Sequence, residues 1–437
     1  MTAPAGAPTP AGPADSPRAD GPFADGPFAE DLDAYRLALR DHLRAEPALE
    51  RFRDRRYPST EAKMADHSRL ERLLYDGGWN RYGWPSAAGG LGGDERHRGV
   101  LYDELAAAGL PIPGQHMLLE TLGPPVARFT PDLAAAHLPA YLRGEEWWGQ
   151  GFSEPEAGSD LASLRCRARG DGDTYVVTGQ KLWTSHGATA TRLVCLVRTG
   201  TPESRHRGLS MIMIDVDAPG VTIRPVAMAN GDNELAEVFF DDVVVPAARL
   251  IGAEGQGWAV AMFLLQFERA MYAWLSAAEA LRRLRELRAQ LSTRAAAGQE
   301  LPADAAPRLG EAYAHLVALR ARSSDTVRRL AAGNTVGPEA SVDKVLLATA
   351  EICLHDTARD LLDDEFLFAT EEAPAGDAPA TASAAAASLA AESSAQVAQW
   401  RTDWWFSRSA TMLGGSAEVQ RTILADHVLG LPKETKP

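Results

Sequence analysis

Two short segments of the chain carry residue types suited to holding a planar or anionic ligand. The first, at residues 147–160, has a strand-like start followed by the turn Phe-Ser-Glu-Pro-Glu-Ala-Gly-Ser-Asp. Small residues in such a turn let backbone N–H groups approach a ligand closely, and serine hydroxyls add hydrogen-bonding groups. The candidate contact residues in this segment are Gly151, Phe152, Ser153, Gly158 and Ser159.

The second segment, Gln-Lys-Leu-Trp-Thr-Ser at residues 180–185, places a flat aromatic side chain beside two hydroxyl residues. Trp183 is suited to stacking on an isoalloxazine ring, while Thr184 or Ser185 hydrogen-bonds toward the reactive nitrogen of that ring. Each segment alone has a simpler explanation, because most Gly/Ser/Pro-rich turns are only turns and a Trp in a strand usually lies in a core.

A carboxylate stands in an otherwise apolar helical pattern at Glu268, directly before Arg269. Poor solvation there raises the pKa of a carboxyl group and makes the carboxylate a stronger base once a substrate excludes water. The alternative is an Arg–Glu pair on a helix surface with no chemical role, which is the commonest situation for a helical Glu. The apolar neighbours are Leu264, Leu265, Phe267, Met271 and Tyr272.

The composition is that of a large globular protein with an acidic balance. The chain has 437 residues, 45% of them hydrophobic, which is enough for a large core spread over two to three domains. Its 44 Lys plus Arg against 59 Asp plus Glu give a net charge of −15. This charge argues against nucleic acid or an anionic membrane as a partner, and a polyanionic substrate would need a local basic pocket.

The cysteines and the N-terminus both indicate a cytoplasmic protein. Cys166, Cys195 and Cys353 lie far apart and lack metal-ligand spacing, so we interpret them as reduced structural thiols with no catalytic role. The N-terminus has neither the basic nor the apolar region of an export signal. No stretch reaches about 18 uninterrupted apolar residues, so no membrane span is expected.

Apolar periodicity divides the chain into a helical part, a strand part and a second helical part. Spacing of three and four residues predicts helices within residues 28–145, from Glu30 onward and then near 60–76, 95–109 and 131–143. Runs rich in β-branched and aromatic residues predict a mostly antiparallel β-domain over 146–247. Helical periodicity returns over 248–437, with predicted helices at 257–284, 306–332, 339–368 and 416–429.

Two further segments are biased in composition. Residues 1–27 are poor in large apolar residues and include most of a tandem Ala-Asp-Gly-Pro-Phe repeat, which predicts a disordered tail. Residues 371–399 are rich in Ala, Ser and Pro, which predicts an inserted loop or linker. Because alanine favours helix, a short exposed helix is compatible with this insert.

The ligand-holding segments together resemble the flavin-binding signature of acyl-CoA dehydrogenases, and their separation of about 25 to 30 residues matches that family. The Gly/Trp-rich loop at 78–93 and the segment Met-Leu-Gly-Gly-Ser-Ala-Glu-Val-Gln-Arg at 412–421 are also similar to it. The resemblance covers residues 30–370 and 400–433. It implies an α+β fold with an N-terminal helical domain, a middle antiparallel β-domain and a C-terminal helical bundle.

The resemblance also implies a reaction, FAD-dependent α,β-dehydrogenation of an acyl thioester. In much of the family the base that removes the α-proton is a Glu in the Gly loop before the last helix, and that position here is Gly414. Other members place the base on the first long helix after the β-domain, just before an Arg, which here is Glu268. We therefore expect Glu268 to be the general base and Arg269 to be a structural or orienting charge. The remaining implied contacts are Ser416 and Glu418 with the flavin, and Ser159, Arg269 and Gly414 with the substrate.

Two elements of the family pattern are missing from the sequence. An Arg-x-x-Phe-Gly segment that reaches the neighbouring subunit's FAD pyrophosphate should follow the helix of the base, but residues 282–302 lack Phe-Gly. A Gln-x-x-Gly-Gly turn that packs on the adenosine diphosphate half should fall near 360–375, where acidic residues would repel a diphosphate. The chain thus resembles subunits of actinobacterial heteromeric acyl-CoA dehydrogenases, including those acting on sterol side chains.

Several alternatives stay open at this point. The assembly can be a heteromer, or a homo-oligomer with a rewired FAD site, or a protein that binds no flavin. The thioester carrier can be CoA or an acyl carrier protein, and an electron-transfer flavoprotein is the acceptor that the resemblance implies. A flavin oxidase or monooxygenase on the same fold is one alternative activity. A non-catalytic structural subunit of a heteromeric enzyme is the other.

Overall fold

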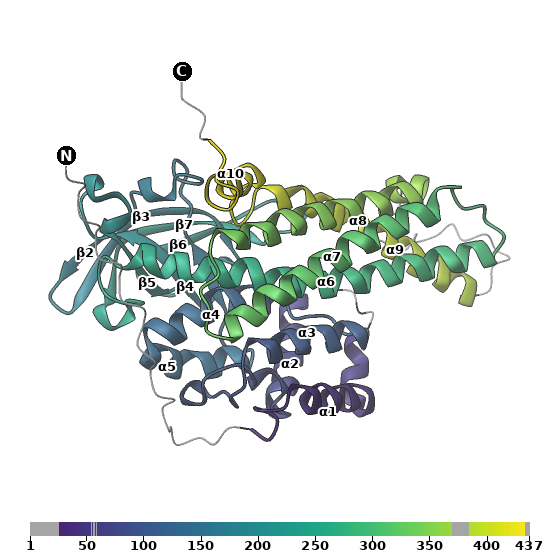
Figure 1. Ribbon diagram of the computed structural model, residues 1–437, viewed down its shortest axis with the longest axis horizontal. Coiled ribbons are helices and arrows are strands. Elements are labelled where there is room, and N and C mark those ends of the chain that lie inside the picture. Colours follow the sequence, from purple (N-terminus) through teal and green to yellow (C-terminus); the bar gives the residue numbers. More distant parts are fainter. Residues whose placement is uncertain (1–25, 54, 56, 58, 369–383, 433–437) are drawn as a thin grey trace, which may run out of the picture.

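A computed structural model of the chain describes residues 26–53, 55, 57, 59–368 and 384–432. The predicted disordered tail therefore lies almost wholly outside the described residues, as does the part of the predicted insert from 371 to 383. Three layers are visible in Figure 1: a group of N-terminal helices, a β-sheet, and a bundle of long helices that extends away from the sheet. The predicted order of helices, strands and helices is confirmed.

The N-terminal helices match the apolar periodicity except at one helix. Asp31 and Ser59 cap the first two, each accepting a hydrogen bond from a backbone N–H in the first turn. The helix at residues 115–129 was not predicted, because Pro124 and Pro125 lie inside it and prolines ordinarily interrupt a helix. The α-helices of this layer within the described residues are α1 (Leu32–Ala45), α2 (Thr60–Asp76), α3 (Glu95–Ala107), α4 (Gln115–Phe129) and α5 (Pro131–Leu142).

The first described residues pack against this helical layer. The backbone N–H of Gly26 donates to the carbonyl of Leu91 at 2.8 Å, and Phe28 stacks on Trp79 with ring centroids 6.1 Å apart. Phe28 also contacts Tyr35 and Tyr82. The second phenylalanine of the tandem repeat therefore packs among the aromatic side chains of the helical layer.

The middle of the chain forms a seven-stranded, mostly antiparallel sheet with the order β1-β4-β2-β3-β7-β6, and β5 pairs with β4. Only the pairings of β4 with β1 and with β2 are parallel. Strands β4 and β5 are buried on both faces, which explains their continuous apolar runs. The strands are β1 (Trp148–Gly151), β2 (Arg167–Asp171), β3 (Thr174–Ser185), β4 (Arg192–Arg198), β5 (Leu209–Asp215), β6 (Val221–Val226) and β7 (Leu235–Pro246).

The C-terminal bundle is organised around one long helix. This helix, α6, contributes residues to three separate apolar clusters, one shared with the sheet, one with the N-terminal helices and one with the rest of the bundle. Burial on several sides explains why its first half is apolar nearly all round. The bundle helices are α6 (Gly257–Ala296), α7 (Ala305–Ala331), α8 (Ser341–Phe368), α9 (Ala384–Ser407) and α10 (Ala417–His427).

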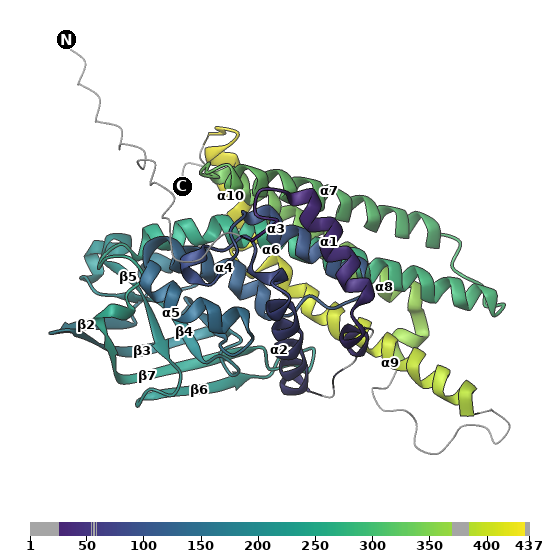
Figure 2. The same ribbon diagram turned by 90° about the horizontal axis from the view of Figure 1, so that it is seen from below.

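Figures 1 and 2 place α10 beside the sheet end of α8, while α9 runs along the distal part of the bundle. The described part of the predicted insert, from Ala384, is the start of α9, a helix of 24 residues rather than a short one. Its last turns bury Val397 and Trp400 in the bundle core, which stabilises it beyond its alanine content. Within residues 26–368 and 384–432, no helix has the length and apolar content needed to cross a membrane.

Candidate active site

Glu268 and Gly414 meet at one point in the structure. Glu268 lies on α6 where this helix passes between the sheet and the bundle, and Gly414 lies in the loop before α10. A Cβ atom built on Gly414 would stand 2.7 Å from Oε1 of Glu268, inside van der Waals contact. The carboxylate of Glu268 therefore occupies the space that a side chain at position 414 would need.

The first ligand-holding segment reaches the same carboxylate. The side chain of Gln150 on β1 lies close enough to Glu268 to lower the pKa of its carboxyl group by hydrogen bonding. The Cα partner of Gln150 on the antiparallel neighbour β3 is Ser185, the last residue of the second segment. The candidate base, both segments and the Gly loop thus converge, although they lie far apart in the sequence.

The electrostatic surroundings of Glu268 suit a base. Burial raises the pKa of its carboxyl group above the ordinary value, while the charge of Arg269, the Gln150 hydrogen bond and the charge of Lys344 oppose the rise. A carboxylate with a raised pKa accepts a proton more readily. The structure also leaves Nε of Arg269 buried and without a hydrogen-bond partner among the described residues.

Lys344 on α8 lies beside the Gly loop and Glu351 lies seven residues further along the same helix, and neither was predicted from the sequence. Nζ of Lys344 is buried and donates to the carbonyl oxygen of Ala410, and its Cε lies 3.7 Å from the Cβ position of Gly414. Burial raises the pKa of Glu351 to about 7, against the opposing charge of Lys344. A lone Lys in an apolar helical run was the available signal, of the same kind that singled out Glu268.

A buried ion pair fastens the turn after β1 to strand β3. Oε1 of Glu154 accepts from Nζ of Lys181 at 2.7 Å and from the N–H of Cys166 at 2.9 Å, while Oε2 accepts from the N–H of Arg165 at 2.6 Å. The backbone N–H of Leu182 adds a bond to the carbonyl of Ser153 at 2.9 Å. Glu154 and Lys181 thus position both ligand-holding segments, although neither was selected as a site residue.

Two of the predicted contact residues in this turn have another structural role. A Cβ on Gly151 would lie 2.6 Å from Sγ of Cys195, so packing against β4 is what requires glycine there. The side chain of Phe152 is buried in the core shared by the sheet and the helices, and its contact with a cofactor stays a prediction. Ser153 is partly exposed, and Gly158 and Ser159 are exposed.

Trp183 is presented outward by an unusual backbone. It adopts φ 61° at an irregularity in the pairing of β3 with β7, and its side chain is 52% exposed. A bulky residue in the left-handed region is strained, and such strain concentrates at functional sites. The next residue, Thr184, is fully buried, and its hydroxyl lacks a hydrogen-bond partner within the described part of the chain. The exposed indole of Trp183 is therefore followed directly by a hydroxyl, that of Thr184, which lacks a hydrogen-bond partner among the residues that the structure describes.

The start of α10 holds the other two predicted flavin contacts. The hydroxyl of Ser416 caps the helix by accepting from the N–H of Val419 at 3.3 Å. Glu418 is exposed and pairs with Arg421 at 4.0 Å. Within a single chain these groups are engaged in capping and pairing, and their contact with a flavin stays a prediction.

The two segments that depart from the family pattern meet at the far end of the bundle. The α6–α7 connection and the end of α8 line one hollow, which contains Arg294, Glu300 and Asp363. Asp363 adopts φ 44°, a left-handed conformation that glycine accommodates far more easily. Arg294 is paired with Glu365. This hollow therefore presents acidic groups, with its arginine already engaged.

Comparison with known proteins identifies the family. Residues 149–243 match the acyl-CoA dehydrogenase middle domain, and residues 255–429 match the acyl-CoA dehydrogenase C-terminal domain. Over 383 residues the chain is 35% identical to acyl-CoA dehydrogenase IpdE1 of Mycobacterium tuberculosis, covering 87% of this chain and 91% of that protein.

Solved structures share the fold over nearly the whole chain. The Tcur3481–Tcur3483 steroid ACAD is 26% identical with a TM-score of 0.73, covering 92% of this chain and 98% of that chain. The ChsE4–ChsE5 complex from Mycobacterium tuberculosis is 25% identical with a TM-score of 0.71, covering 93% and 98%. The predicted fold class and the predicted resemblance are confirmed: the chain belongs to the acyl-CoA dehydrogenase family.

Proposed function

We propose that the chain catalyses FAD-dependent α,β-dehydrogenation of an acyl-CoA, with Glu268 as the base that removes the α-proton. The observation that carries this proposal is the convergence of Glu268, Gln150 and the Gly414 loop at one point. Trp183 and Thr184 would hold the ring of FAD, and bound FAD would supply the hydride acceptor for the β-hydrogen. Glu268 holds the proton taken from the α-carbon, and its poor solvation favours the protonated product of that step.

The residues around Trp183 fit the flavin ring. The exposed indole offers a face for stacking, and the buried hydroxyl of Thr184 needs a partner that the described residues do not supply. Ser185 is held beside Gln150 by the strand register and supplies a second hydroxyl on the same strand. Gly414 keeps the space next to the base free of any second side chain, and Arg269 supplies an unsatisfied donor beside it.

The experiment is anaerobic reduction of the flavin by acyl-CoA thioesters, followed as bleaching of the visible flavin band. Glu268→Gln removes the basic oxygen while keeping the side-chain shape, so we expect loss of bleaching with the flavin still bound. Glu279→Gln on the same helix is the matched control, because Glu279 is partly exposed, pairs with Arg282 and lies about three helical turns from Glu268. Wild-type bleaching by Glu268→Gln would overturn the assignment. Fast reoxidation by air after reduction would instead favour the oxidase alternative.

We further propose that an unlike subunit completes the FAD site. The hollow at residues 294–303 and 361–363 is acidic where the family contacts a diphosphate, and two of the most similar solved structures are named as pairs of different chains. The chain should therefore be purified alone and after co-expression with a second acyl-CoA dehydrogenase-like chain encoded nearby. We expect full flavin loading only in the second case, whereas one tightly held FAD per chain with turnover in the first case would contradict a heteromer.

A further inference from the structure

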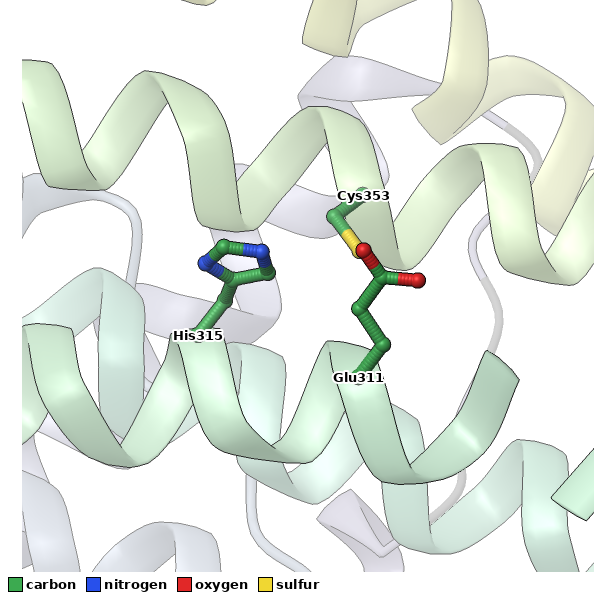
Figure 3. A group of neighbouring side chains, drawn as sticks. All are labelled: Glu311, His315 and Cys353. Atoms are coloured by element: carbon green, nitrogen blue, oxygen red, sulfur yellow. The ribbon is translucent and has the colours of Figure 1, made fainter. Parts of the chain in front are cut away.

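A cluster of metal-ligating side chains lies between α7 and α8, away from the Glu268 carboxylate. Glu311 and His315 are four residues apart on α7, so they lie on one face of the helix, one turn from each other. Cys353 faces them from α8. Figure 3 shows the three side chains pointing into the space between the two helices, and their ligand atoms all lie within 4.8 Å of one another.

The donor set is specific in its chemistry. A carboxylate oxygen, an imidazole nitrogen and a thiolate sulfur together suit a borderline-soft divalent ion, and zinc in particular. The carboxylate and the thiolate supply two negative charges against the two positive charges of the ion, with the neutral imidazole as third ligand. A cysteine that the sequence indicated to be merely structural is therefore the distinctive member of this cluster.

There is room for a fourth ligand. The cluster borders a hollow of about 390 Å³ that is lined by α7, α8 and the start of α10. Glu311 is exposed, and His315 and Cys353 are partly exposed, so an ion and its water molecules have access. Thr411 and Ala417, which flank the Gly414 loop, also line this hollow.

We propose that Glu311, His315 and Cys353 form a zinc site that clamps α7 to α8, with a water molecule as the fourth ligand. On binding, a sulfur–zinc bond replaces the S–H bond of Cys353 and the proton passes to solvent, so no electrons are transferred. The ion joins two helices of the bundle beside the loop before α10, so its binding is expected to stabilise the bundle.

The test uses untagged full-length protein, with its partner subunit where one is needed, after treatment with a chelator. Co²⁺ replaces zinc as a spectroscopic probe, and difference spectra against the metal-free protein remove the flavin contribution. We expect one equivalent of Co²⁺ to produce a thiolate-to-metal charge-transfer band, and one equivalent of Zn²⁺ to raise the midpoint of thermal unfolding. Cys166 and Cys195 are buried thiols that a metal cannot reach without unfolding, so the band reports on Cys353.

Cys353→Ser should abolish the band, and His315→Ala should weaken Zn²⁺ binding about tenfold or more. His427→Ala, which removes an exposed histidine at the end of α10, is the matched control and should leave both readouts unchanged. Co²⁺ binding without a thiolate band would overturn the proposal. So would Zn²⁺ binding that Cys353→Ser leaves unaltered, since the metal would then be held adventitiously at another place.

Discussion

Oε1 of Glu268 lies 2.7 Å from the position that a Cβ of residue 414 would take. A side chain at position 268 of helix α6 and one at position 414 of the loop before α10 would therefore occupy the same space. Only one carboxylate fits there. A Glu in the loop and a Glu on the helix would thus place a carboxylate at the same position, and this chain carries its carboxylate on the helix while the loop has a glycine. This geometry leads to two predictions.

Gly414→Ala should lower turnover more than it lowers stability. Alanine at φ 65° is strained by about 1 kcal/mol, and its Cβ would press on the Glu268 carboxylate. We expect reduced kcat with flavin content retained. Gly430→Ala is the matched control, because Gly430 has φ 62° but nothing within 4 Å of its Cβ position. Equal loss of turnover in the two variants would show that backbone strain alone, rather than contact with Glu268, is responsible.

Moving the carboxylate from the helix to the loop should restore part of the activity. Glu268→Ala alone should abolish flavin bleaching by acyl-CoA, because no base remains at the site. The double variant Glu268→Ala/Gly414→Glu places a carboxylate at the vacated point from the other side, at the cost of left-handed strain. We expect measurable bleaching, slower than wild type. A double variant as inert as Glu268→Ala, with bound flavin and an unchanged unfolding midpoint, would argue against equivalence of the two positions.

Gln150→Leu should shift the pH dependence of the reaction. The Gln150 hydrogen bond favours the ionised form of Glu268 and lowers its pKa, against the rise caused by burial. The base must be ionised to accept a proton, so losing this bond moves the acidic limb of the kcat/KM profile to higher pH. The plateau at high pH should be largely retained and is the internal control. If the acidic limb of the kcat/KM profile lies at the same pH in Gln150→Leu and in the wild type, Gln150 does not lower the pKa of Glu268.

Glu351→Gln should change how stability depends on pH. Burial raises the pKa of Glu351 to about 7 in the folded protein, so between about 4.5 and 7 the folded state binds more protons than the unfolded state. Stability from this group is present below that window and is lost as pH rises through it. The variant should therefore lose less stability than wild type between pH 5 and about 8, measured by urea unfolding. If the free energy of unfolding changes with pH in the same way for the variant and the wild type, the pKa of Glu351 is not raised.

The sequence was sufficient where a residue pattern is local. Continuous apolar runs in β4 and β5, alternation in β6 and β7, and the apolar pattern of α6 follow from how each element is buried, so these elements and the fold class were predictable. The convergence of Gln150, Glu268 and Gly414 was not, since strand register and helix packing decide it. Glu268 itself was singled out because a charge in an apolar helix is visible in the sequence.

Two features of the predicted residues depend on tertiary packing, which the sequence does not show. Gly151 was expected to admit a ligand, which stays a prediction, and the structure adds that a side chain there would meet Cys195. Cys353 was grouped with the structural thiols because Glu311 and His315 lie far from it in the sequence, and only the pairing of α7 with α8 brings these residues together. The sequence around each of these residues does not indicate which residues of another helix it will contact.

Lys181→Met should destabilise the protein strongly, because it leaves the buried carboxylate of Glu154 without its cation. Truncating one partner of a buried pair costs about 3 to 5 kcal/mol. Two backbone N–H groups still donate to Glu154 in this variant, so we expect a loss of stability near the lower end of that range. Replacing both charges with Lys181→Met/Glu154→Gln should cost less than the sum of the single variants, because neither substitution then strands a charge.

The matched control is the pair of Arg165 and Glu156, which lie at 2.9 Å but are 80% and 71% exposed. Arg165→Met should cost less than about 1 kcal/mol, because solvent screens an exposed pair. Lys181 precedes Trp183 by two residues on β3, so loss of the ion pair should also make the position of Trp183 less fixed. We therefore expect weaker flavin binding, measured as FAD released on gel filtration. Equal destabilisation by Lys181→Met and Arg165→Met would mean that the Glu154 turn is not held by this ion pair. Flavin loss without destabilisation would instead place Lys181 in direct contact with the cofactor.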